Sequence, residues 1–124
     1  MTEEDKQLLF KDLSARLPYG VMVLVKGEKY FNETNEPYIV TLSFGTYLFD
    51  DEDITLVPYL RPMSSMTEEE EDEYMIARQK DIAEAYIHAT PQNAIDWLNA
   101  HHFDYRGLIE KGLALEASED MYIF

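Results

Sequence analysis

The residue types best suited to chemistry gather in one short stretch, His101-His102-Phe103-Asp104. Imidazole and carboxylate groups bind zinc when three or four of them converge from separate points of a fold. Here the histidines are adjacent, so their side chains diverge on a helix or strand, and no HExxH spacing supports them. His88 and Asp96 could join only if the fold brought them alongside. We therefore predict no metal site, with one histidine capping the preceding helix and the other exposed.

Nucleophilic and phosphate-binding chemistry has little support in the sequence. Cysteine is absent, and the serines lack a GxSxG or SxxK context. The five glycines are scattered turn formers, so no phosphate-binding loop is present. We predict a protein that is not an enzyme and needs no cofactor. A hydrolase or metal-dependent enzyme is the least favoured alternative.

Acidic side chains dominate the chain and concentrate in two runs. The net charge at pH 7 is −15, from 25 acidic residues against 10 lysines and arginines. The first run is Asp50, Asp51, Glu52 and Asp53, and the second is Glu68, Glu69, Glu70, Glu71, Asp72 and Glu73. Direct binding to a phosphate backbone needs basic patches, and the sequence shows none. We predict that both runs bind a protein with a basic surface, unless the second is only a solvated helix start.

Length and composition indicate a globular protein. A chain of 124 residues with 46% hydrophobic residues suits a single domain over residues 1–124. The acidic beginning of the chain lacks the basic flank of a signal peptide, and no apolar run approaches membrane length. We expect a cytoplasmic protein that does not bind membranes.

The sequence pattern changes near residue 64, from short runs typical of strands to longer runs typical of helices. Residues 1–63 are expected to hold a helix and a β-sheet half, and residues 64–124 a helical half. The first helix should span residues 2–17, with Thr2 as its cap and an ion pair between Asp12 and Arg16. Its expected buried face consists of Leu9, Phe10, Leu13 and Leu17.

Short β-branched and aromatic runs follow, and they predict about five strands at 21–26, 29–32, 38–44, 46–49 and 54–57. Such strands favour a small, strongly bent antiparallel sheet or an SH3-like open barrel. A flat meander covered by the first helix is the main competitor. Aromatic residues are abundant in this half, so one face of the sheet could present tyrosines for recognition.

The longest helix is predicted over residues 67–89, directly on the acidic run. Its apolar residues recur at helical spacing and are expected to face the core, as Met75, Ile76, Ile82, Ala83, Tyr86 and Ile87, with Gln79 among them. Replacing Ile82 by Ala should then cost about 2–4 kcal/mol of stability. Replacing Glu70 by Gln should cost less than about 0.5 kcal/mol. Shorter helices are expected at 91–100 and 104–111, before an extended tail.

Three stretches carry a resemblance: ARLPYGV at 15–21, PYLRPMSSMTEEE at 58–70 and LNAHHFDYRGLIEKGLALEA at 98–117. They resemble a family of small uncharacterised proteins of gut Bacteroidales genomes and their phage or mobile elements. The match covers about 40 residues. The resemblance implies a context, an accessory protein of a phage or mobile element, and no catalytic residue.

These observations favour an α+β fold and a non-enzymatic acidic protein-interaction module, acting as an accessory or inhibitory factor. The alternative is a mimic of nucleic-acid charge that occupies a basic groove on a host defence or DNA-processing protein. A mimic needs carboxylates spaced like phosphates along a surface. An interaction module needs an apolar or tyrosine patch with acids at its rim. The sequence leaves this choice, and the oligomeric state, open.

Overall fold

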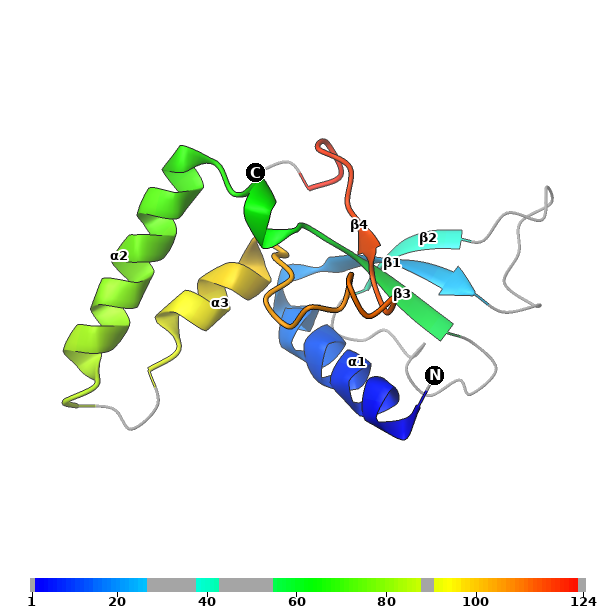
Figure 1. Ribbon diagram of the computed structural model, residues 1–124, viewed down its shortest axis with the longest axis horizontal. Helices are drawn as coiled ribbons and strands as arrows, with labels where there is room; N and C mark the ends of the chain where they lie inside the picture. Colours follow the sequence, from blue (N-terminus) through cyan, green and yellow to red (C-terminus); the bar gives the residue numbers. More distant parts are fainter. Residues whose placement is uncertain (1, 27–37, 43–54, 88–90, 123–124) are drawn as a thin grey trace.

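The structure, a computed structural model, describes residues 2–26, 38–42, 55–87 and 91–122. The fold is α+β, as predicted, with an N-terminal helix, a small mixed sheet and C-terminal helices. In Figure 1, helix α1 (Glu3–Arg16) lies against the sheet, and helix α3 (Asn93–Ala100) separates helix α2 (Glu68–Glu84) from the rest of the molecule. None of the helices in the described ranges has the length and apolar character needed to cross a bilayer.

Helix α1 forms where the sequence predicts it. The Thr2 hydroxyl accepts a hydrogen bond from the Asp5 N–H at 3.1 Å, and the Asp5 carboxylate accepts one from the Thr2 N–H, which completes a capping box. A 3₁₀ turn, η1 (Leu17–Tyr19), then ends the helix at Gly20, whose φ of 70° favours glycine. Leu9 and Leu13 are buried as expected, but Phe10 is exposed because it lies to one side of the face that meets the sheet.

Four strands form the described part of the sheet, in the order β2-β1-β3-β4. Strand β1 (Val21–Lys26) pairs antiparallel with both β2 (Tyr38–Leu42) and β3 (Thr55–Leu60), with Val23 opposite Val40 and Pro58. Strand β4 (Leu115–Glu116) pairs parallel with the end of β3, so the sheet is mixed and not purely antiparallel. The expected strands at 29–32 and 46–49 lie outside the described residues, and neither five strands nor an SH3-like barrel is confirmed.

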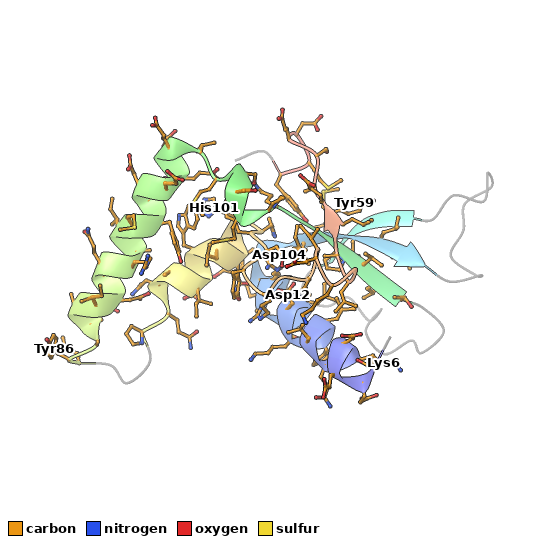
Figure 2. All side chains as sticks on the ribbon, in the orientation of Figure 1. Lys6, Asp12, Tyr59, Tyr86, His101 and Asp104 are labelled. Carbon is orange, nitrogen blue, oxygen red and sulfur yellow. The ribbon has the colours of Figure 1, made fainter. Side chains whose placement is uncertain are left out.

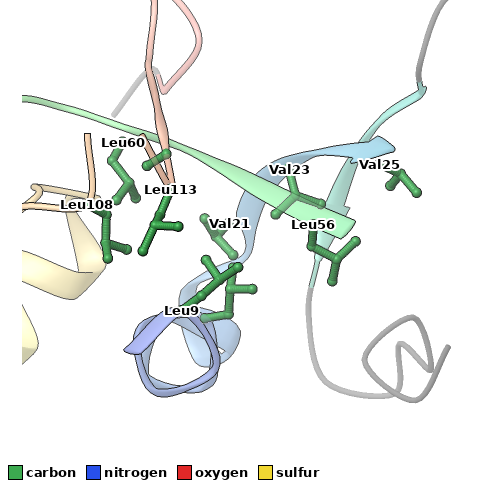
Figure 3. Packing of buried hydrophobic residues seen from close by; sticks show 10 residues of the cluster. Leu9, Val21, Val23, Val25, Leu56, Leu60, Leu108 and Leu113 are labelled. Atoms are coloured by element: carbon green, nitrogen blue, oxygen red, sulfur yellow. The ribbon is translucent and has the colours of Figure 1, made fainter. Parts of the chain in front are cut away.

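One hydrophobic core joins α1, the sheet and the C-terminal segment. Alternate residues of β1 point to the same side and are fully buried there, namely Val21, Val23 and Val25. They pack with leucines of α1 and β3 and with Leu108 and Leu113 from the C-terminal segment (Figure 3). No residue of α2 belongs to this core.

The segment predicted as a helix at 104–111 is a series of turns. Asp104 does accept hydrogen bonds from the backbone N–H groups of Leu108 and Ile109, at 2.8 and 3.0 Å. The turn goes no further because Gly107 and Gly112 both have φ of 75°, a left-handed conformation that ends a helix. The helix prediction for 104–111 is therefore wrong, and Asp104 caps a turn instead. The tail is extended as predicted at β4, where it adds a short strand at the edge of the sheet.

Candidate functional site

Thr67 caps helix α2, so the predicted beginning is confirmed, but the helix ends at Glu84 and residues 85–87 form a turn, so the predicted extent of 67–89 is too long. The Thr67 hydroxyl accepts a hydrogen bond from the Glu70 N–H at 3.1 Å, and the Glu70 carboxylate accepts one from the Thr67 N–H, also at 3.1 Å. This capping box starts the helix within the acidic run. Carboxylates in a first helical turn lie at the positive end of the helix dipole, which stabilises them there. Local chemistry therefore favours a helix start within the run.

Glu70 is directed toward the body of the protein, unlike its neighbours. Its two carboxylate oxygens accept hydrogen bonds from the Arg61 guanidinium at 2.7 and 2.8 Å, and both side chains are largely buried. The Arg61 hydrogen bond is the main reason that the pKa of Glu70 is lowered. Glu68, Glu69, Glu71, Asp72 and Glu73 remain exposed. The predicted partner-binding run therefore contains one structural residue and five that face solvent.

The side of α2 that packs on the protein is unusually polar. Its partly buried residues follow alternating steps of four and three, as Glu70, Tyr74, Ala77, Asp81 and Glu84. We call these five residues the inner face. The Tyr74 ring lies 5.7 Å from the Trp97 ring of α3, and the Glu84 carboxylate accepts a hydrogen bond from the Asn93 side chain at 2.9 Å.

Asp81 attaches the two helices most directly. Its carboxylate accepts hydrogen bonds from the backbone N–H groups of Asn93 and Ala94, at 2.8 and 3.0 Å, and from the Asn93 side chain at 3.0 Å. Gln92, the residue at the cap position of α3, provides no side-chain cap. Asp81 thus caps α3 from another helix. Partial burial alone would raise the pKa of Asp81, but the hydrogen bonds from Ala94 and Asn93 outweigh it and lower that pKa.

The apolar face of α2 points to solvent, contrary to the sequence prediction. Three of its large side chains, Met75, Ile76 and Ile82, are exposed, and so are Tyr86 and Ile87 in the turn that follows Glu84; these five are between 47% and 93% exposed. Gln79 and Ala83, on the same side of the helix, are exposed as well. We call these seven residues the outer stripe. Figure 2 shows Tyr86 just past the end of α2 that lies farthest from the sheet.

The two histidines serve the structure in different ways. His101 is the residue at the C-terminal cap of α3, as expected for one of the pair, and its ring stacks on Trp97 with 4.0 Å between ring centroids. His102 is buried, so the expectation that the second histidine is exposed is wrong. Its ring stacks on Tyr122 at 4.0 Å, and its backbone has φ of 60°, a left-handed conformation that turns the chain out of α3. Burial, followed by the charge of Arg16, lowers the pKa of His102 to about 3.

The stretches quoted for the resemblance meet at Phe103. The Arg16 guanidinium donates a hydrogen bond to the Phe103 carbonyl at 2.7 Å, and the Arg61 guanidinium lies 4.2 Å from the centre of the Phe103 ring. The backbones of Arg61 and residues 102–104 also exchange two hydrogen bonds of 2.8 Å. This junction orders the beginning of α2, because Arg61 also holds Glu70.

A buried ion-pair cluster supports the same junction. Asp12 accepts hydrogen bonds from Arg16 at 2.9 and 3.0 Å and from Arg106 at 2.9 Å, and the side chains of Asp12 and Arg16 are fully buried. The sequence predicts the pair of Asp12 with Arg16 from their spacing. Its burial and the contribution of Arg106 were missed, because they depend on the fold bringing residues 94 positions apart together.

The other predicted site residues are placed as follows. Asp50, Asp51, Glu52 and Asp53 lie outside the described residues. Five aromatics of the sheet half also lie outside them, namely Tyr30, Phe31, Phe44, Tyr47 and Phe49. Of the other three, Tyr38 begins β2, Tyr19 is exposed and Tyr59 is partly buried. Across the residues that the structure describes, no three His, Asp or Glu side chains form a group that could hold a metal ion. The prediction that the histidines form no zinc site still needs a calorimetric zinc titration.

Comparisons of the chain with protein-family models, with curated proteins and with solved structures found no match. The resemblance to small proteins of gut Bacteroidales therefore stays a prediction.

Proposed function

We propose that the chain is a non-enzymatic protein-interaction module that docks through the outer stripe of α2. The observation that carries this proposal is the exposure of five large apolar side chains, three on one face of α2 and two in the turn directly after it. Contiguous apolar surface of this kind commonly marks an interaction site in a protein that is otherwise well packed. The inner face is polar, so the attachment of α2 to the protein leaves the apolar side of the helix available.

The charge around the outer stripe supports a partner of defined chemistry. Glu68 and Asp72 precede Met75 along the same side of the helix, at steps of four and three residues. Glu69, Glu71 and Glu73 are exposed nearby. The complementary surface is therefore apolar, with lysines or arginines at one end. Such a partner fits the predicted role of an accessory or inhibitory factor, and the resemblance would place that role in a phage or mobile element.

The same observation bears on the nucleic-acid mimic. A mimic needs carboxylates distributed along the surface that enters a basic groove. The exposed carboxylates at the start of α2 occupy only its first two turns, and apolar residues follow them. An apolar stripe contributes little inside a groove built for phosphates. The geometry of α2 thus supports an interaction module better than a mimic.

The experiment is an affinity capture from a gut Bacteroidales lysate, followed by purification of each captured protein and measurement of its Kd. The test variant is Ile82→Gln with Tyr86→Gln, which removes two large side chains of the outer stripe. The matched control is Ile95→Gln, an exposed apolar residue on α3. We expect the test variant to weaken binding at least about tenfold, and the control to bind like the parent. Equal affinities for parent and test variant would refute docking through the outer stripe.

A further inference from the structure

We infer that the occupant of the outer stripe is an α-helix that lies antiparallel to α2 and carries lysines or arginines at its C-terminal end. This inference rests on the proposed function and adds the form and the orientation of the partner. It depends on the spacing of the exposed residues, on the way α2 already binds a helix, and on the position of the exposed acids.

The exposed residues have the spacing of a helix–helix seam. Residues 68, 72, 75, 79 and 82 alternate between steps of four and three, so they form one line along the outer side of α2, and Tyr86 follows in the turn after the helix. The apolar part of this line, from Met75 to the end of the helix at Glu84, rises about 14 Å, or about two and a half helical turns. A single helix of about 10 residues covers that length, and the residues beside the line, Ile76 and Ala83, widen it for the flank of such a helix.

The inner face of α2 provides a precedent within the chain. Its residues follow the same alternation, at 70, 74, 77, 81 and 84. Tyr74, Asp81 and Glu84 contact helix α3, whereas Glu70 binds Arg61. The two seams lie on opposite sides of α2. A second helix on the outer seam would place α2 between two helices, and no rearrangement of the inner contacts is needed.

The orientation follows from charge. The exposed carboxylates lie at the N-terminal end of α2, beside Glu68 and Asp72, and the apolar residues lie toward its C-terminal end. In a partner helix, lysine and arginine are most stable at the C-terminal end, where they oppose the negative end of the helix dipole. An antiparallel helix brings that end against the acids. It also sets the two helix dipoles in opposite directions.

A second copy of this chain fits the seam poorly. A parallel copy places Glu68 and Asp72 against the same residues of its partner, which is repulsive. An antiparallel copy centred on Gln79 places Asp72 against Tyr86 and buries carboxylates without a basic partner. Each copy also carries a net charge of −15, which opposes association. A basic partner removes all three costs.

The test uses the full chain and two labelled helical peptides of about 18 residues. Both have the same composition and the same apolar seam, but one has its lysines at the C-terminal end and the other at the N-terminal end. Fluorescence anisotropy gives each Kd at low and at physiological salt. We expect the C-terminal-lysine peptide to bind at least about fivefold tighter at low salt, with the difference shrinking as salt rises. Its affinity should fall in the Ile82→Gln, Tyr86→Gln variant and stay unchanged in Ile95→Gln.

Four results would overturn the inference. Equal binding of both peptides refutes the orientation, and binding of neither refutes a helical occupant. A dimer of the parent chain in sedimentation velocity that is lost in the Ile82→Gln, Tyr86→Gln variant identifies a second copy as the occupant. The proposed function fails separately, if the captured protein binds the parent and the Ile82→Gln, Tyr86→Gln variant with equal affinity. A captured protein that needs the outer stripe but shows no protected helix in hydrogen exchange would refute this inference and leave that function standing.

Discussion

At the scale of single residues, adjacent glutamates at the start of α2 have different roles. Glu70 completes the capping box, and both of its oxygens bind Arg61, whereas Glu69 and Glu71 on either side are exposed. Arg61 in turn lies on the ring of buried Phe103, so Glu70 connects α2 to the core through two contacts. The sequence shows six acids in a row and gives no sign that one is structural. That distinction depends on Arg61, which reaches Glu70 only after the turn at 62–66 has formed.

Glu70→Gln tests this difference. The substitution keeps the size of the side chain but removes the charge from a largely buried pair, and we expect a loss of about 1–2 kcal/mol of unfolding free energy. This replaces the smaller effect expected from the sequence. Glu69→Gln is the matched control and should change stability by less than about 0.5 kcal/mol. Urea unfolding followed by circular dichroism measures both variants. Indistinguishable midpoints would mean that the Arg61–Glu70 pair contributes no stability.

His102 provides a second residue-scale prediction, through pH. Burial and the nearby positive charges lower the pKa of His102 to about 3 in the folded protein. The ordinary histidine pKa, about 6.5, applies in the unfolded chain. Between these values the unfolded chain binds the extra proton, so the unfolding free energy falls as the pH falls. From pH 7.5 to pH 5 the loss should be about 2 kcal/mol.

The control for this pH dependence is His102→Gln, which has no titrating ring. Urea unfolding of both proteins across pH 5–7.5 separates His102 from Glu70 and Asp81, whose lowered pKa values act at more acidic pH. The variant should lose most of the pH dependence over this range, even if it is less stable at every pH. The same slope in both proteins would mean that His102 is not kept neutral by burial.

At the scale of elements, the sequence predicts which segments are helices better than which faces are buried. The Thr2 cap and the beginnings of α1 and α2 agree with prediction, because the signals are local. The prediction of which face of α2 is buried was wrong, because the apolar face is exposed. Periodicity identifies the apolar side of a helix, but burial depends on which side another element covers. Here α3 covers a polar side, since Asp81 and Glu84 find hydrogen-bond donors there that a sequence pattern does not reveal.

Ile82→Ala tests whether the apolar face of α2 is exposed. Ile82 is exposed, so the substitution should change the unfolding free energy by less than about 0.5 kcal/mol, instead of the larger loss expected for a core position. The reference is Leu13→Ala on α1, where the side chain is buried in the core and the expected loss is about 3 kcal/mol. Thermal or urea unfolding of the two variants compares them directly. A large loss of stability for Ile82→Ala in the isolated chain would mean that Ile82 faces the core, as the sequence predicts.

At the scale of the whole molecule, the α+β architecture could be predicted because the change of residue pattern near residue 64 is strong. What the sequence did not reveal is the central role of Phe103. Arg16 and Arg61 are far apart in the chain, yet each binds at or beside Phe103. A buried junction of this kind comes from tertiary proximity and has no periodicity. The candidate site could be predicted only in part. The sequence shows the acidic run, but its pattern assigns the apolar surface next to that run to the core.

Net charge acts over the whole molecule, whereas the proposed docking surface is local, and a matched pair of variants separates the two. Replacing Glu69, Glu71, Asp72 and Glu73 by Gln or Asn removes exposed carboxylates beside the outer stripe and keeps Glu70. The control replaces Glu110, Glu116, Glu119 and Asp120, which are equally exposed but lie in the C-terminal segment. Both variants change the net charge by the same amount, and neither removes the Arg61–Glu70 pair.

Stopped-flow or surface plasmon resonance measurements with a captured partner should then show a local effect. Charges at the rim of an interface act mainly on encounter, so the first variant should lower the association rate several-fold at low salt and change the dissociation rate less. Screening beyond about 8 Å at physiological salt should shrink this difference. The control should associate nearly as fast as the parent. If both variants slow association equally, the steering comes from net charge alone, and the acids at the start of α2 have no special part in binding.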